Sequence, residues 1–191
     1  MAFYKSILLI FLSCLFLQCN NKNVSDSERF AKEYPLAGSD NIFLYRNSSE
    51  TADILEKGRG IVFIGFKECS WCQYYAVLLQ DVAREMEIDK IYYCDIKKDR
   101  ENNSENYKRI VNILSGRLQY DDEGQARVYV PDVSIVSRGR IIARDFETSK
   151  ETLGYSTPEE YWNEDRVNAL KERLRPGINI LHQLISRDCN C

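Results

Sequence analysis

The feature that most constrains this chain is a short apolar segment followed at once by two closely spaced cysteines. Residues 61–66 read Ile-Val-Phe-Ile-Gly-Phe, an apolar run rich in β-branched and aromatic side chains that is typical of a strand buried on both faces. The following segment, 70–87, has the apolar period of one helical face, at Tyr74, Val77, Leu78, Val82 and Met86. Cys69 and Cys72 therefore fall where a buried strand turns into a helix.

Further strands and helices alternate on both sides of this segment. Apolar runs predict strands at 42–45, 90–96, 128–136 and 141–146. Start and stop signals predict helices at 48–58, about 107–118, 158–174 and, after a break at Pro176-Gly177, up to Ser186. A tight turn at 137–140 joins the last two strands as a hairpin. The order predicts an α/β fold, a sandwich with a mixed central sheet.

The length of 191 residues allows one domain with additions. A hydrophobic content of 44% with 29% charged residues is that of a folded chain and excludes a disordered one. We expect four parts, namely a signal peptide at 1–18, a polar tether at 19–40, the α/β domain at 41–150, and a C-terminal helical extension at 151–191 that ends in Cys-Asn-Cys.

The N-terminus has the pattern of a secretory signal. Lys5 precedes an apolar run of 11 residues at 7–17, and a polar stretch follows. That run has about half of the ~20 residues that a membrane-spanning helix needs. The sequence therefore predicts an exported, extracytoplasmic protein.

The end of this run resembles a bacterial lipobox. The motif is Phe-Leu-Gln-Cys at 16–19, and the resemblance implies that Cys19 is lipidated and anchors the exported protein to the membrane. Cys14, after Phe-Leu-Ser, is a second candidate for the lipidated residue. An ordinary cleaved signal and an uncleaved anchor remain the alternatives.

Charge and composition exclude several classes of site. The net charge is −3, with acids and bases interspersed, so no basic surface for nucleic acid is expected. His182 is the single histidine, which excludes a His-rich metal site. The carboxylates at 95, 99 and 121–123 lack the spacing of a calcium loop.

The Cys69-Ser70-Trp71-Cys72 motif carries the chemistry that the sequence predicts. Unpaired amide groups and the positive end of the helix dipole stabilise a thiolate in the first turn of a helix, which favours Cys69 as the nucleophile. Cys72 lies three residues on and can close the disulfide that releases a bound substrate. Trp71 would present a flat apolar surface on which a partner protein can dock.

With these residues the chain resembles the thioredoxin superfamily. The resemblance covers about 42–146 and rests on the strand at 61–66, the cysteine motif, and Val130-Pro131-Asp132 before the hairpin. It implies a three-layer α/β/α sandwich in which Pro131 has a cis peptide bond and, with Val130, guides the substrate backbone. More narrowly, the chain resembles thioredoxin-like lipoproteins, including bacteriocin transport accessory proteins.

Three positions differ from the family pattern. Ser70-Trp71 stands between the cysteines where thioredoxins have Gly-Pro, Glu68 replaces the usual aromatic before the first cysteine, and Phe63 replaces a buried aspartate that transfers protons. The negative charge of Glu68 disfavours a thiolate on Cys69, and Lys67 opposes that effect.

The remaining cysteines leave alternatives open. Cys189 and Cys191 are either a tail pair without a role or a second redox pair that exchanges with Cys69 and Cys72. The four together could instead bind zinc, although a C-x-C half is unusual. A purely structural Cys69–Cys72 disulfide is a third possibility. Cys94 lies in an apolar run and is expected in the core.

The predicted function is therefore extracytoplasmic thiol–disulfide exchange on protein substrates. Electrons move between thiols, so we expect no organic cofactor and no metal, and we expect a second redox protein as partner. The alternatives are a non-catalytic accessory lipoprotein that serves as a docking module for an exporter, and a zinc-stabilised interaction domain.

Overall fold

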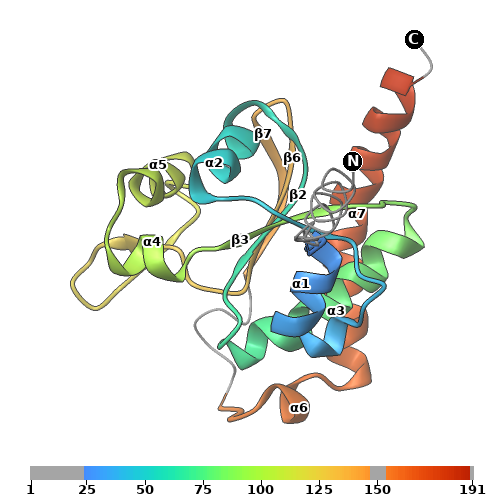
Figure 1. The fold of residues 1–191 in the computed structure, drawn as a ribbon, viewed down its shortest axis with the longest axis horizontal. Coiled ribbons are helices and arrows are strands. Elements are labelled where there is room, and N and C mark those ends of the chain that lie inside the picture. The colour runs from blue at the N-terminus through green and yellow to red at the C-terminus, as the bar shows by residue number, and fades with distance from the viewer. Residues whose placement is uncertain (1–23, 147–153, 190–191) are drawn as a thin grey trace, which may run out of the picture.

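The computed structural model describes residues 24–146 and 154–189, with side chains up to residue 187. Strands and helices alternate from β1 to α4, and the later strands and helices follow one another in groups (Figure 1). The elements are α1 (Asp26–Glu33), the 3-10 helix η1 (Pro35–Ala37), β1 (Phe43–Tyr45), α2 (Ser48–Lys57), β2 (Arg59–Gly65), α3 (Ser70–Glu85), β3 (Ile91–Asp95), α4 (Lys97–Glu101), α5 (Glu105–Ile113), β4 (Gln119–Tyr120), β5 (Ala126–Arg127), β6 (Asp132–Ser137), β7 (Arg140–Asp145), α6 (Pro158–Tyr161) and α7 (Glu164–Cys189).

A five-stranded mixed sheet forms the centre of the protein, in the order β1-β3-β2-β6-β7. β1, β3 and β2 run parallel, whereas β6 pairs with β2, and β7 with β6, in antiparallel fashion. β2 therefore lies in the middle, and from Gly60 to Gly65 every residue of it is buried. This confirms the α/β class, the mixed sheet and the central strand predicted at 61–66.

Helices cover both faces of the sheet (Figure 1). α2 and α5 pack on one face, whereas α1, α3 and α7 lie on the other. The face below α1 and α3 is filled largely by aromatic rings, with Phe30 stacked on Phe43 at a centroid distance of 4.0 Å. This cluster consists of Phe30, Tyr34, Phe43, Tyr45, Phe63, Tyr75 and Tyr93.

The segment expected to be a polar tether is folded from Asp26 onward. Ser25 and Glu28 form a capping box that starts α1. Phe30 and Tyr34, four residues apart, are both fully buried against the sheet. The folded domain therefore begins before residue 41, because these two rings belong to the central core.

The C-terminal helix is continuous where a break was expected at Pro176-Gly177. Pro176 lies within α7 on its exposed side, and Gly177 faces the sheet. Buried leucine and isoleucine side chains flank this point on the inner face, at Leu170, Leu174, Ile178 and Leu181. Their burial holds the helix together across the proline, because tertiary packing outweighs one missing backbone hydrogen bond. α7 is thus a layer of the domain rather than an appendage.

Other boundaries also differ from the prediction. The helix expected at 158–174 is divided into α6 and the first part of α7, with a break at residues 162–163. The polar stretch after β3 forms the short helix α4. The helix expected at about 107–118 is α5, which begins at Glu105 and ends at Ile113. The strand expected at 128–136 is shorter, since residues 128–131 are not part of a strand and β6 runs from Asp132 to Ser137. β5, just before this segment, pairs with β4 as a separate hairpin.

Gly177 provides a test of the packing of α7. A Cβ atom at this position would lie 2.5 Å from the Cβ of Ala143 and 2.9 Å from the Cδ1 of Ile135. Glycine to alanine in a helix normally stabilises a protein by about 1 kcal/mol. We expect Gly177→Ala instead to lower the free energy of unfolding by roughly 1–3 kcal/mol, as overpacking does, measured by urea denaturation.

Asn179→Ala is the matched control, because Asn179 is exposed on the same helix. It should leave stability unchanged or slightly raised. Equal stabilisation by both substitutions would contradict the close contact between α7 and the sheet.

Candidate active site

The two cysteines of the motif lie at the N-terminus of α3, directly after the loop that leaves β2. Cys69 is the N-cap residue, and its sulfur accepts a hydrogen bond from the backbone amide of Cys72 at 3.1 Å. The Cα atoms are 5.2 Å apart and the two sulfurs form a disulfide. The first-turn amides and the helix dipole therefore act on the Cys69 sulfur, as the sequence predicts.

The two sulfurs differ in how accessible they are. Cys72 is fully buried, whereas Cys69 is partly exposed. An attacking protein thiolate can therefore reach only the residue at the helix cap. The two residues are therefore not equivalent, because Cys69 lies at the surface and Cys72 lies behind it.

Gly65, the last residue of β2, lets α3 approach the sheet closely. A Cβ atom there would lie 3.3 Å from the Cys72 sulfur and 3.1 Å from the Tyr34 hydroxyl. Both distances are tight, so a side chain at position 65 would force one of these neighbours to shift. The Tyr34 hydroxyl in turn donates a hydrogen bond to the hydroxyl of Tyr93 at 3.0 Å. Cys72 is thus packed against the aromatic cluster.

The Val130–Pro131 peptide bond is cis, as the resemblance implied, and both residues are buried. Ile64 pairs with Asp132 across the sheet, so continuing this register sets Pro131 opposite Gly65. Val130 and Pro131 therefore lie at the end of the sheet at which Cys72 packs.

A buried ion pair fixes the strand that follows this proline. The fully buried carboxylate of Asp132 binds the guanidinium of Arg144, whose side chain is only 6% exposed. Burial raises the pKa of Asp132, and the bond to Arg144 opposes that rise. The guanidinium also donates to the backbone carbonyl of Arg117, which ties β7 to the loop before β4.

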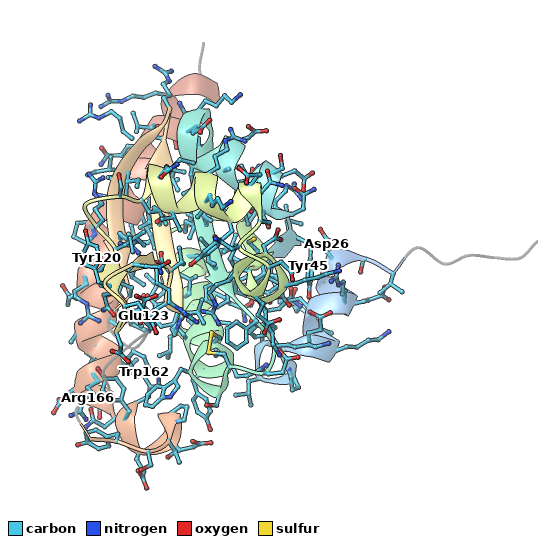
Figure 2. The ribbon with its side chains drawn as sticks, turned by 90° about the vertical axis from the view of Figure 1, so that its left-hand side faces the viewer. Asp26, Tyr45, Tyr120, Glu123, Trp162 and Arg166 are labelled. Carbon is cyan, nitrogen blue, oxygen red and sulfur yellow. A yellow bond between two sulfur atoms is a disulfide. The ribbon has the colours of Figure 1, made fainter. Side chains whose placement is uncertain are left out.

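Aromatic side chains of the C-terminal segment close one side of the site. Trp71 packs edge-on against Tyr161 of α6 at a centroid distance of 5.5 Å. Trp162 points inward to Tyr75 of α3, at 6.2 Å (Figure 2). Trp71, expected to face a partner, is therefore only partly exposed and shares its surface with α6.

Tyr75 also fixes the position of α3. Its hydroxyl donates to the buried carboxylate of Asp145 at 2.9 Å, and Arg173 of α7 donates to the same carboxylate at 2.8 Å. Burial, together with the carboxylate, raises the pKa of Tyr75 far above its usual value, so the hydroxyl stays protonated and able to donate. α3, β7 and α7 thus meet one turn below the disulfide.

The charge of Glu68 has a partner that was not expected. Lys97 at the start of α4 forms an ion pair with Glu68 at 3.5 Å. A backbone hydrogen bond and this lysine lower the pKa of Glu68. The positive charge of Lys97 thus offsets the carboxylate that precedes Cys69, together with that of Lys67.

Asp95 is an ionisable group near the site that sequence reasoning missed. Its partner across the parallel β2–β3 ladder is Gly65, and two residues earlier Phe63 and Tyr93 pair with their rings 5.7 Å apart. Side chains two apart on a strand point to one face. The Asp95 carboxylate therefore lies on the face where Cys72 packs.

The surroundings of Asp95 raise the pKa of its carboxyl above the usual value. Burial is the main cause of its raised pKa, and the carboxylates of Glu68 and Glu33 add to the effect. The amide of Lys97 donates to its Oδ1 at 3.0 Å and the charge of Lys67 is nearby, and both oppose the rise.

The end of α7 that carries the backbone of Cys189 lies away from the site. The Nη1 of Arg59, at the beginning of β2, donates to the carbonyl of Leu184 near the end of α7, whereas Cys69 follows the end of β2. Cys189 ends α7 and therefore lies at the far end of the sheet. Its side chain, Cys191, Cys14 and Cys19 are outside the described residues, as is the predicted signal.

Cys94 is a buried free thiol, as expected. Burial raises its pKa to about 12, so it remains a thiol at neutral pH. It lies on β3 and takes no part in the site.

No three His, Cys, Asp or Glu side chains come together as a metal site in the part of the chain that the structure describes. None of the helices in the same part is both long and apolar enough to cross a membrane. Comparisons with protein-family models, curated proteins and solved structures found no match for this chain.

Proposed function

We propose that this protein catalyses thiol–disulfide exchange with protein substrates through Cys69 and Cys72. The observation that carries the proposal is the unequal exposure of two sulfurs at one helix N-terminus, with the cap sulfur reachable and its partner buried. A pair that served only to staple the fold would not need a reachable sulfur beside a thiolate-stabilising helix end.

The exchange proceeds in two steps. The Cys69 thiolate attacks one sulfur of a substrate disulfide, that S–S bond breaks, and the leaving sulfur takes up a proton. Cys72 then loses its proton and attacks the Cys69 sulfur, which releases the second substrate thiol and forms the Cys69–Cys72 disulfide. Two electrons have passed to the substrate, and a partner dithiol restores the pair. The same steps in reverse oxidise a substrate dithiol.

The proposal includes a thioredoxin-like fold. Its support is the combination of the strand order β1-β3-β2-β6-β7, the cysteines at the start of α3 and the cis Val130–Pro131 bond beside them. Val130 and Pro131 would guide the backbone of a bound substrate at the end of the sheet, and the exposed part of Trp71 would contact its side chains.

We also propose that the protein acts outside the cytoplasm, held to the membrane by lipid on Cys19. The support is the basic start, the short apolar run and the lipobox-like Phe-Leu-Gln-Cys at 16–19. An oxidising environment of that kind lets the disulfide form and persist.

Substitution of single cysteines tests the proposed roles. Cys69→Ser should abolish reduction of a disulfide-linked protein substrate such as insulin. Cys72→Ser should stall after the first step and accumulate a mixed disulfide between Cys69 and the substrate, visible by mass spectrometry under non-reducing conditions. Cys94→Ala is the matched control, since this buried thiol contacts Thr51 and Ser48 of α2, on the other face of the sheet from Cys72, and should retain full turnover.

The docking-module alternative predicts the opposite result in cells. If a chain with both Cys69→Ser and Cys72→Ser complements deletion of the gene as well as the wild type does, the protein acts by binding rather than by electron transfer.

We propose that Asp95 accepts the proton of Cys72 in the second step. Phe63, which stands at the position of the proton-transferring aspartate of thioredoxins, has no group that could accept it. Asp95→Asn should slow formation of the Cys69–Cys72 disulfide from the mixed disulfide by roughly 100-fold at pH 7, the size of a general-base effect. The deficit should shrink as pH rises, because the Cys72 thiol then ionises unaided. Stopped-flow measurement of Trp71 fluorescence in a Trp162→Phe background, across pH 5–9, reports the rate.

The pH dependence of stability distinguishes a loss of proton transfer in Asp95→Asn from a loss of folding. Because folding raises the pKa of Asp95, its carboxyl favours the folded state at low pH and loses that contribution as pH rises through the folded-state pKa. Asp95→Asn should therefore be at least as stable as the wild type at pH 7. Asp89→Asn, at an exposed position just before β3, is the control. Parallel pH profiles for wild type and Asp95→Asn would exclude the proton-transfer role.

A further inference from the structure

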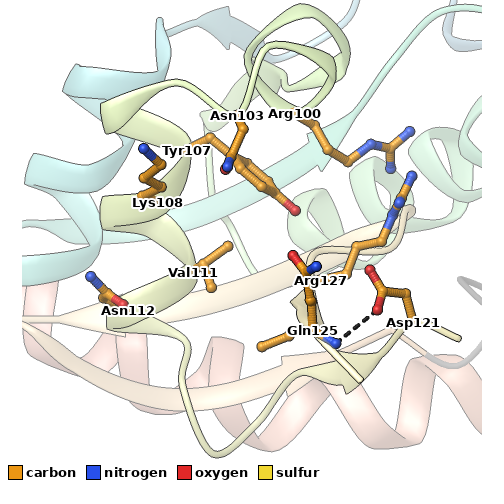
Figure 3. A pocket seen from close by; sticks show the side chains of 10 residues that line it. Arg100, Asn103, Tyr107, Lys108, Val111, Asn112, Asp121, Gln125 and Arg127 are labelled. Carbon is orange, nitrogen blue, oxygen red and sulfur yellow. Dashed lines mark hydrogen bonds between the residues drawn. The ribbon is translucent and has the colours of Figure 1, made fainter. Parts of the chain in front are cut away.

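A polar cavity of about 400 Å³ lies between the helices α4 and α5 and the β4–β5 hairpin (Figure 3). Its size falls within the range of small-molecule sites, about 300–1,000 Å³. It is separate from the cysteine pair, because neither cysteine nor any residue of α3 lines it. The lining residues are mostly polar or cationic, among them Arg100, Asn103, Tyr107, Asp121, Gln125 and Arg127.

Two arginine side chains converge in this cavity. Figure 3 shows the guanidinium groups of Arg100 and Arg127 directed to the same region. The pKa of Arg100 is lowered, first by burial and second by the positive charge of Arg127. Two like charges thus oppose each other in a half-buried place, an arrangement that costs free energy unless an anion lies between them.

Protein contacts leave part of both guanidinium groups unsatisfied. Arg100 donates through Nη1 to the carbonyl of Val128 at 3.3 Å and stacks over Phe66, while Arg127 stacks over Tyr129. Within the described residues, the buried Nε of each arginine has no hydrogen-bond acceptor. Neither guanidinium forms an ion pair there with a carboxylate.

The other charges of the cavity are already engaged. Lys108 forms an ion pair with Glu105 at 2.7 Å. Asp121 is the one carboxylate of the lining, and it accepts a hydrogen bond from the backbone amide of Gln125 at 2.8 Å. The two arginines therefore outweigh the single negative charge of Asp121, and the lining keeps a net positive charge.

We propose that this cavity is a binding site for a small organic anion, held through a phosphate or carboxylate group between Arg100 and Arg127. The planar forks of two guanidinium groups match the oxygens of such groups and bind them more strongly than neutral donors do. The Tyr107 hydroxyl accepts from the Val128 amide at 3.3 Å and still has its own proton to donate. Asn103 and Gln125 offer hydrogen bonds to a polar body of the ligand, which an apolar ligand could not use.

Isothermal titration calorimetry of the full chain, purified in a mild detergent, tests the site. The probes are glycerol 3-phosphate and succinate, with glycerol and sodium chloride as controls at equal ionic strength. We expect saturable binding of one molecule per chain for at least one of the two anions, and none for the controls. Binding of glycerol 3-phosphate alone would assign a phosphate group, and binding of succinate alone a carboxylate.

Substitutions locate the binding. Arg127→Gln should raise the dissociation constant of the anion at least ten-fold. Arg100→Lys should also raise it, because lysine keeps the charge but loses the planar guanidinium that binds two oxygens at once. Lys98→Gln removes a charge from the exposed side of α4 and should change nothing. Circular dichroism checks that each variant is folded.

Two results would overturn the proposal. One is the absence of saturable binding of either anion to the wild type. The other is binding that a folded Arg127→Gln retains at full strength, because the anion would then be held elsewhere. The test does not depend on thiol chemistry, and the chain with Cys69→Ser and Cys72→Ser should bind the anion as the wild type does.

Discussion

The contact between the end of β2 and the start of α3 is the constraint on which the rest of the structure depends. Gly65 has no side chain, so the Cys72 sulfur and the Tyr34 hydroxyl occupy the space that a Cβ would need. This close approach buries Cys72 and leaves Cys69 at the helix cap, partly exposed. A larger residue at Gly65 would force the Tyr34 or Cys72 side chain to shift by a few tenths of an ångström.

The surrounding layers hold this contact rigid. The hydroxyl of Tyr75 and the guanidinium of Arg173 meet on the buried carboxylate of Asp145, which joins α3, α7 and β7. Directly after Pro131, the buried carboxylate of Asp132 forms an ion pair with Arg144, which compensates its charge. A site whose residues are placed by strands and helices needs little rearrangement when a substrate arrives, and that favours exchange chemistry.

Local sequence patterns were sufficient for the centre of the fold and for the cysteine site. The apolar run at 61–66 and the helix after Cys69 depend only on neighbouring residues, and the structure has β2 and α3 there. The buried face of α3 was placed wrongly, because Tyr75 and Leu79 are buried rather than Tyr74 and Leu78. Long-range packing accounts for what was missed. The continuity of α7 past Pro176 depends on contacts with β6 and β7, and the placement of Asp95 depends on the register of β3 against β2. The capping box at Ser25 was the available signal for α1, because it marks a helix start in a segment whose polar composition suggests a tether.

The reduction potential of the Cys69–Cys72 pair tests the central claim most directly. The pair would be equilibrated with glutathione buffers of known ratio, and the free thiols of both residues would be trapped and counted by mass. If the pair catalyses exchange, its transition is reversible, involves two electrons and lies between about −120 and −270 mV, the range of known exchange catalysts. A pair that stays oxidised far below about −300 mV would be a structural disulfide, and that result would contradict catalysis by this site.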